Sequence, residues 1–179
     1  NGLKTGSVAA KSLYTGMVTD SGRFRYDATT SRTFELAAFL MQEEFDITGI
    51  YMNLYAEDYD QAKVRAKFLL KSRLTEHHVA YIYNTLQEVE ESGLSTFAVS
   101  RGMVGVMADM KGIDIWVNFT EAPEGVFCEI RSGKYNINPI AVKYGGGGHA
   151  KASGCTLHSR KEAMQLLDDL INLGENYLL

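Results

Sequence analysis

The sequence predicts an α/β (α+β) protein in which a helical N-terminal part is joined to a C-terminal domain with a mixed sheet covered by helices. Apolar residues recur at helical spacing in the first part, whereas from Val79 onward they alternate at the spacing of a strand. After Val79, segments typical of strands and helices follow in the order β-α-α-β-β-α-β-α. We therefore expect two domains, residues 1–74 and 75–179, with a boundary near Leu74.

Three stretches with helical periodicity make up the first part. One extends from about Ser7 to Thr19, and Gly22 marks the turn that follows. Another runs from Tyr59 to about Ser72. Between them lies the clearest amphipathic stripe, which consists of Phe34, Ala37, Ala38, Met41 and Phe45.

In the second part, strand signals are bounded by helix caps and turns. Thr85-Leu86-Gln87-Glu88 is a capping box for a short helix after the first strand, and a second helix is expected to end near Met110. Alternation over 113–119 and 126–130, with a turn at 122–125, predicts a hairpin. A helix beside Asn138, a strand from Ala152 to Leu157 and a terminal helix after the Ser159-Arg160-Lys161-Glu162 capping box complete the domain.

Composition excludes several classes of function. The net charge of −4 argues against a long track for duplex DNA, since such binding needs many Lys and Arg. No apolar run approaches the roughly 20 residues that span a bilayer, so no membrane association and a cytoplasmic location are expected. Cys128 and Cys155 lie in expected strands without metal-ligand spacing, which favours small buried side chains over a chemical role.

The glycine run Gly145–Gly148, followed by His149, is the strongest candidate binding feature. Consecutive glycines let several backbone N–H groups approach one anion, and this run lies directly between a helix and a strand. His149 is a candidate donor to a phosphate oxygen. Arg131 ends a strand and precedes Ser132 and Gly133, which would direct a bidentate guanidinium beyond the sheet.

A candidate metal ligand lies in the first part. Asp20, in Thr19-Asp20-Ser21-Gly22, offers a carboxylate for Mn²⁺ or Mg²⁺, although spacing alone favours an Asp that forms a turn. His77 and His78 are adjacent, so their side chains diverge and they are interpreted as surface residues.

Two segments resemble known motifs. LYTGMVTDSGRFRY (13–26) with ATTSRTFELAAFL (28–40) resembles the last catalytic motif of DHH phosphoesterases. IRSGKYNINPIAVKYGGGGHAKASG (130–154) resembles the signature of their DHH-associated C-terminal domain, and KGIDIWVNF (111–119) fits the strand before it. The resemblance covers nearly the whole chain and is strongest to the nanoRNase and 3′-phosphoadenosine-5′-phosphate (pAp) phosphatase group, which is called NrnA-like.

This resemblance implies a Mn²⁺ pair, with Mg²⁺ as an alternative, in a phosphoesterase that hydrolyses short oligoribonucleotides or pAp. It implies that Asp20 is a catalytic metal ligand, with Arg23 and Arg25 as weaker candidates nearby. The residues it implies for substrate binding are Arg131, Ser132, Asn138, Gly147, Gly148 and His149. For Asn138, a structural role as the N-cap of the following helix is an equal alternative.

The Asp-His-His triplet that names the family does not occur in the sequence. Because the chain also begins at Asn1 rather than Met, we expect a piece of a longer protein that is inactive alone. The rival functions are a phosphodiesterase for cyclic or linear dinucleotides, a RecJ-like exonuclease and a non-catalytic nucleic-acid-binding module. Whether the chain forms a homodimer is left open.

Overall fold

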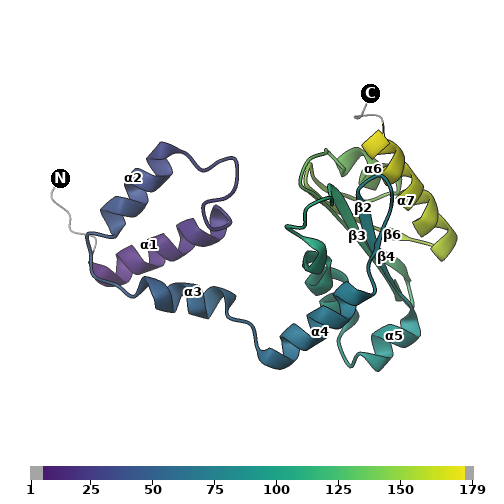
Figure 1. The fold of residues 1–179 in the computed structure, drawn as a ribbon, viewed down its shortest axis with the longest axis horizontal. Helices are drawn as coiled ribbons and strands as arrows, with labels where there is room; N and C mark the ends of the chain where they lie inside the picture. The colour runs from purple at the N-terminus through teal and green to yellow at the C-terminus, as the bar shows by residue number, and fades with distance from the viewer. Residues whose placement is uncertain (1–5, 176–179) are drawn as a thin grey trace. The chain divides into compact units, whose positions relative to one another are not determined.

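The computed structural model describes residues 6–175, which divide into two compact units that separate between Asp58 and Tyr59 (Figure 1). The first unit is helical and the second contains a six-stranded mixed sheet with helices, so the predicted fold class is confirmed. Helix α4 (Tyr59–Leu70) belongs to the second unit, whereas the sequence-based boundary lies near Leu74. The reason is that Phe68 packs into the same core as Ala80 and Ile82.

Helices α1 (Ser7–Asp20), α2 (Ser31–Leu40) and α3 (Ile47–Tyr55) form the first unit. The predicted stripe from Phe34 to Phe45 is wrong in part, because α2 ends at Leu40 and its Phe34 is 55% exposed. Helix α3 was not predicted. Its N-cap is Asp46, whose side chain accepts a hydrogen bond from the backbone of Gly49 at 2.9 Å. The core of this unit consists of Ala10, Tyr14, Val18, Ala37, Leu40 and Ile50.

The sheet of the second unit has the strand order β1-β2-β3-β4-β6-β5. Only β2 and β3 pair in parallel, and all the other neighbours are antiparallel. The predicted strands and the hairpin between β3 and β4 are present, and two short strands, β1 and β5, join them at the edges. The six strands are β1 (Arg73–Leu74), β2 (Val79–Asn84), β3 (Ile115–Ala122), β4 (Gly125–Ser132), β5 (Gly147–His149) and β6 (Ala152–Leu157).

Helices pack on both faces of this sheet (Figure 1). One face buries its apolar side chains against α6 (Asn138–Lys143) and α7 (Arg160–Glu175). On the other face, α4 and α5 (Leu86–Glu91) pack with the π-helical turn η1 (Ala98–Gly102) and the 3-10 turn η2 (Val104–Met107). The second helix that was predicted to end near Met110 is therefore replaced largely by η1 and η2. Within residues 6–175, no helix combines the length and the apolar character that crossing a bilayer requires.

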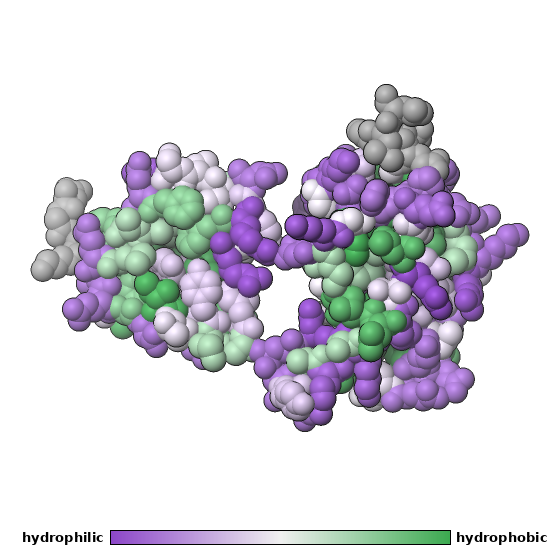
Figure 2. All heavy atoms as spheres, in the orientation of Figure 1, coloured by the Kyte–Doolittle hydropathy of each residue, from purple (hydrophilic) through white to green (hydrophobic). Residues whose placement is uncertain are grey.

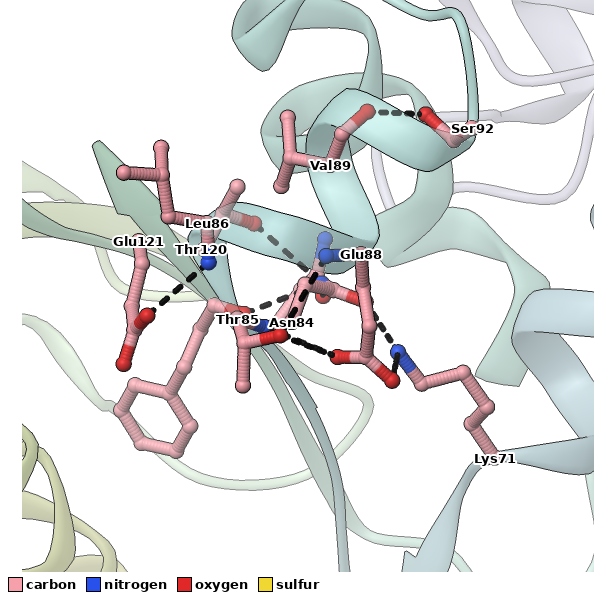
Figure 3. A network of polar contacts seen from close by, with 11 residues as sticks. Lys71, Asn84, Thr85, Leu86, Glu88, Val89, Ser92, Thr120 and Glu121 are labelled. Atoms are coloured by element: carbon pink, nitrogen blue, oxygen red, sulfur yellow. Dashed lines mark hydrogen bonds and ion pairs between the residues drawn. The ribbon is translucent and has the colours of Figure 1, made fainter.

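Helix α5 begins with the predicted capping box, which also links α5 to α4 (Figure 3). The Thr85 hydroxyl accepts from the backbone N–H of Glu88 at 3.3 Å, and the Glu88 carboxylate accepts from the backbone N–H of Thr85 at 2.9 Å. Lys71, just after α4, forms an ion pair with Glu88 at 2.8 Å. Burial opposes ionisation of Glu88, but the hydrogen bonds from Lys71 and Thr85 outweigh it and lower the pKa of this carboxyl group.

Candidate functional site

A cavity of about 800 Å³ lies in the second unit between η1 and the strands β4, β6 and β5. The sheet register explains which side chains reach it. Arg131 pairs with Ala152, which in turn pairs with His149, so all three project from the same face. Gly147 pairs with Gly154 on that face as well. The fold therefore brings Arg131, Gly147 and His149, which the sequence singled out separately, to one cavity.

The glycine run forms part of the sheet. Gly145 has a φ of +76° directly after α6, and Gly147 and Gly148 belong to the edge strand β5. Gly148 has a φ of +136°, and a Cβ built on it would lie 2.7 Å from the Cα of Ser153. A Cβ on Gly147 would meet no heavy atom within 4 Å. Gly148 is therefore required for close approach of β5 and β6, whereas Gly147 leaves space at the cavity wall.

Charged side chains from two elements meet at the cavity wall. The Glu129 carboxylate accepts hydrogen bonds from the Arg131 guanidinium at 3.2 Å and from Nε of Arg101 at 3.0 Å. The Glu129 side chain is 14% exposed, whereas those of Arg131 and Arg101 are 27% and 63% exposed. Two cations thus face the cavity against one carboxylate. Both guanidinium groups keep N–H donors beyond those that Glu129 engages, so the wall is suited to an anion.

Arg101 and Phe97, which also line the cavity, were not singled out from the sequence. The Arg101 guanidinium lies 5.3 Å from the centre of the Phe97 ring, and Phe97 is 65% exposed. An exposed aromatic ring beside an arginine offers a stacking surface for a planar ligand group. The π-helical turn is the signal that marks this segment, because such turns occur often at functional sites.

Asn118 of β3 holds η1 over the sheet. Its side-chain amide donates to the carbonyl oxygens of Val99 at 2.7 Å and Ser100 at 2.8 Å, directly before Arg101. Its own oxygen accepts from the side chain of Asn84 at 2.9 Å. Asn118 and Asn84 are both fully buried. This hydrogen-bonded pair therefore fixes the segment that carries Arg101 and Phe97.

Ser132 and Asn138 lie outside the cavity wall. The Ser132 hydroxyl donates to the carbonyl of Asp114 at 3.2 Å and accepts from the backbone N–H of Tyr135 at 2.7 Å, so it orders the turn after β4. The predicted N-cap role of Asn138 is wrong, because Asn138 is the first residue of α6 and Ile137 occupies the cap position.

The side chain of Asn138 instead connects α6 to the strand pair that carries the glycines. Its amide donates to the hydroxyl of Ser153 at 3.3 Å. That hydroxyl donates to the backbone carbonyl of His149 at 2.8 Å. Asn138 and Ser153 therefore fix the backbone at His149, whose side chain is exposed.

In the first unit, Asp20 is the exposed last residue of α1. The turn that follows is tightly wound, with positive φ at Gly22, Arg23 and Phe24. The Arg23 guanidinium lies 4.5 Å from the centre of the Tyr55 ring, and Arg25 donates to the carbonyl of Gly22 at 3.1 Å.

A metal pair needs several ligands, and Asp20 supplies one carboxylate. Over the part of the chain that the structure describes, no group of three or more His, Cys, Asp or Glu side chains is placed to hold a metal ion. The residues present therefore do not fit a complete metal centre.

The model of the DHHA1 domain matches residues 78–174. The "Bifunctional oligoribonuclease and PAP phosphatase NrnA" of Bacillus subtilis is 32% identical over 99% of this chain and 56% of its own length. A "Probable bifunctional oligoribonuclease and PAP phosphatase NrnA" of Streptococcus mutans is 31% identical over 97% of this chain and 56% of its own length. The chain thus spans about half the length of these curated relatives.

A solved structure has the same fold. An "exopolyphosphatase-related protein from Bacteroides Fragilis" superimposes with a TM-score of 0.81, over 93% of this chain and 50% of that chain, at 24% identity. The family model covers more than half of this chain, and the resemblance inferred from residues 13–40 and 111–154 is confirmed. The chain belongs to the DHHA1 domain family.

Proposed function

We propose that this chain is the substrate-binding part of a Mn²⁺-dependent phosphoesterase, with Mg²⁺ as the alternative metal, which hydrolyses short oligoribonucleotides or pAp. The observation that carries the proposal is the cavity at which Arg131, Arg101, Gly147 and His149 converge. Its volume of about 800 Å³ is in the range of small-ligand sites. The relatives named as oligoribonuclease and PAP phosphatase support this substrate class.

The cavity residues have complementary roles in this proposal. Arg131 contacts the terminal phosphate through the N–H groups that Glu129 leaves available, and His149 donates to a phosphate oxygen. The edge strand β5 adds backbone N–H groups, because alternate residues of an edge strand point away from the sheet. A nucleobase stacks on Phe97. Ser132 and Asn138 support the site by ordering the backbone at its border rather than through side-chain contacts with substrate.

We further propose that Asp20 is one metal ligand of a larger catalytic domain, of which the first unit is a part. The first unit exposes many large apolar side chains, which gather on the face shown in Figure 2. Such a surface is typical of a face that packs against another protein segment. The exposed residues include Val8, Leu13, Phe34, Phe39, Met41 and Met52.

Binding of two matched ligands tests the phosphate site. We expect the chain to bind a 5′-phosphorylated dinucleotide at least tenfold more tightly than the same dinucleotide with a free 5′-hydroxyl. His149→Ala and Arg131→Ala should each weaken binding of the phosphorylated ligand by about 1.5–3 kcal/mol, which is typical of a lost charge-assisted hydrogen bond. Both variants should lose most of the discrimination between the two ligands, as measured by calorimetric titration.

Two control variants match the test variants in residue type. His158→Ala removes another exposed histidine, and Arg73→Ala removes an exposed arginine from β1, at the opposite edge of the sheet. Both should keep wild-type affinity. Equal affinity of the wild type for the two dinucleotides would mean that the terminal phosphate does not bind in this cavity.

A nucleic-acid-binding module without catalysis is a second candidate function. The observation in its favour is that the cavity is formed by the second unit alone. Asp20→Ala separates the two candidates when it is introduced into the complete protein. An enzyme should lose turnover and keep most of its substrate affinity, whereas a binding module has no turnover to lose.

A further inference from the structure

Cys128 and Cys155 are direct partners on the antiparallel strands β4 and β6. Such partners project from the same face, with their Cα atoms about 4.5–5.5 Å apart. This separation falls inside the range of about 4.4–6.8 Å that a disulfide spans. Both cysteines are free, and their side chains form a hydrogen bond with each other. The sheet thus places two thiols where one covalent bond can join them.

The two thiols differ in their surroundings. Cys128 is 1% exposed and lies within the core beneath α6 and α7, whereas Cys155 is partly exposed at the border of that core. Burial raises the pKa of Cys128, and the hydrogen bond from Cys128 lowers the pKa of Cys155. Cys155 is therefore the more accessible of the two thiols and the one whose pKa is lowered, so we assign it as the attacking cysteine. Cys128 is the thiol that reacts with it in the second step.

We propose that Cys128 and Cys155 form a reversible modification site at which a hydroperoxide produces an intrachain disulfide. The Cys155 thiolate attacks the terminal oxygen of the hydroperoxide, the O–O bond breaks, and the alkoxide leaves with a proton as an alcohol. The resulting sulfenic acid reacts with the Cys128 thiol, so the S–S bond forms and water leaves. In total, two thiols are oxidised by two electrons and one hydroperoxide is reduced. A dithiol restores both cysteines by exchange.

The modification site lies directly beneath the glycine run. A Cβ built on Gly146 would lie 2.8 Å from the Cα of Cys155, so these two backbones are in close contact. The disulfide would close a loop of about 27 residues between Cys128 and Cys155, which restricts the unfolded chain. We therefore expect the oxidised chain to melt several degrees above the reduced chain. This inference does not depend on the proposed phosphoesterase function.

Treatment of the reduced chain with a small excess of cumene hydroperoxide tests the proposal. We expect the intact mass to fall by about 2 Da, labelling by maleimide under denaturing conditions to be lost, and a peptide linking Cys128 to Cys155 to appear after digestion. Dithiothreitol should reverse all three changes. The melting temperature, followed by circular dichroism, should rise on oxidation and return on reduction.

Two single-cysteine variants assign the order of the steps. In Cys128→Ser, which cannot form the disulfide but keeps a hydroxyl donor beside Cys155, the remaining Cys155 should form a sulfenic acid that dimedone captures. In Cys155→Ala, the buried Cys128 should stay unmodified under the same treatment. Two labelled thiols in the treated wild type, oxidation of Cys155 to a sulfinic acid without a cross-link, or disulfides only between chains would each overturn the proposal.

Discussion

Gly147 and Gly148 are neighbours in β5, yet a methyl group on each would meet different surroundings. Gly147→Ala places its methyl group in open space at the cavity wall, so the variant should melt within about 2 °C of the wild type, as exposed substitutions do. It should nevertheless bind the phosphorylated dinucleotide at least tenfold more weakly. Gly148→Ala forces a contact with the backbone of β6 at a positive φ, so it should lower the melting temperature markedly.

Thermal denaturation and titration of the two glycine variants measure these effects separately. Unchanged affinity in Gly147→Ala would mean that no ligand group approaches this strand. A wild-type melting temperature for Gly148→Ala would contradict the close packing of β5 against β6.

At the scale of single residues, the sequence indicated candidate binding residues wherever a residue type is uncommon at its place in a strand or loop. A run of glycines before His149 and an arginine at a strand end stand out without any structure. Arg101 and Phe97 did not, because a lone arginine near an aromatic residue is typical of many solvated surfaces. Their position at the cavity wall depends on the register that places β4, β6 and β5 opposite η1, and no local pattern encodes that proximity.

Among the elements, η1 depends on a single buried side chain of β3. Asn118→Ala would leave the carbonyl oxygens of Val99 and Ser100 without their side-chain donor, which costs about 1–3 kcal/mol in unfolding free energy. It should also weaken nucleotide binding severalfold, because Arg101 follows these carbonyls directly. Urea denaturation measures the first effect and ligand titration the second.

Thr120→Val is the matched control for Asn118→Ala. Thr120 is equally buried in β3 but accepts a hydrogen bond from Asn84 instead of holding η1. This variant should lose stability without losing ligand affinity. If ligand affinity falls in proportion to unfolding free energy, and equally so in both variants, then Asn118 has a purely structural role.

The start of α5 provides an independent test at the level of an element. Thr85→Ala removes the hydroxyl that accepts from the backbone N–H of Glu88, so unfolding free energy should fall by about 1 kcal/mol. Thr85→Ser keeps the acceptor and should restore most of that loss. Chemical denaturation of the three proteins checks this order, and equal stability of the alanine and serine variants would contradict the capping role.

The elements that were predicted correctly are specified by residues close together in the sequence. The α5 capping box and the hairpin turn are short-range signals, and both are present in the structure. Other elements depend on packing across the chain. Asn118 and Thr120 alternate with apolar residues, yet both are buried because helices cover this face of the sheet too. Likewise, β5 becomes a strand only because β6 lies beside it.

For the whole molecule, the fold class and the four longer strands were predictable, whereas helix α3, the edge strands β1 and β5 and the boundary between the two units were not. Hydrophobic periodicity identifies each helix by itself, but it does not indicate against which of the two cores the helix packs. Helix α4 illustrates this, because Phe68 packs against β2 of the second unit.

The chain of 179 residues should therefore fold and bind nucleotides but fail to hydrolyse them. Asp20 lies exposed at the end of α1, and the described residues provide no cluster of ligands that could complete a metal pair around it. Incubation with Mn²⁺ and a 5′-phosphorylated dinucleotide, followed by chromatography, should show intact substrate. The Bacillus subtilis relative, assayed in parallel, serves as the positive control. Mn²⁺-dependent cleavage that disappears in Asp20→Ala would demonstrate that this chain contains a working metal centre of its own.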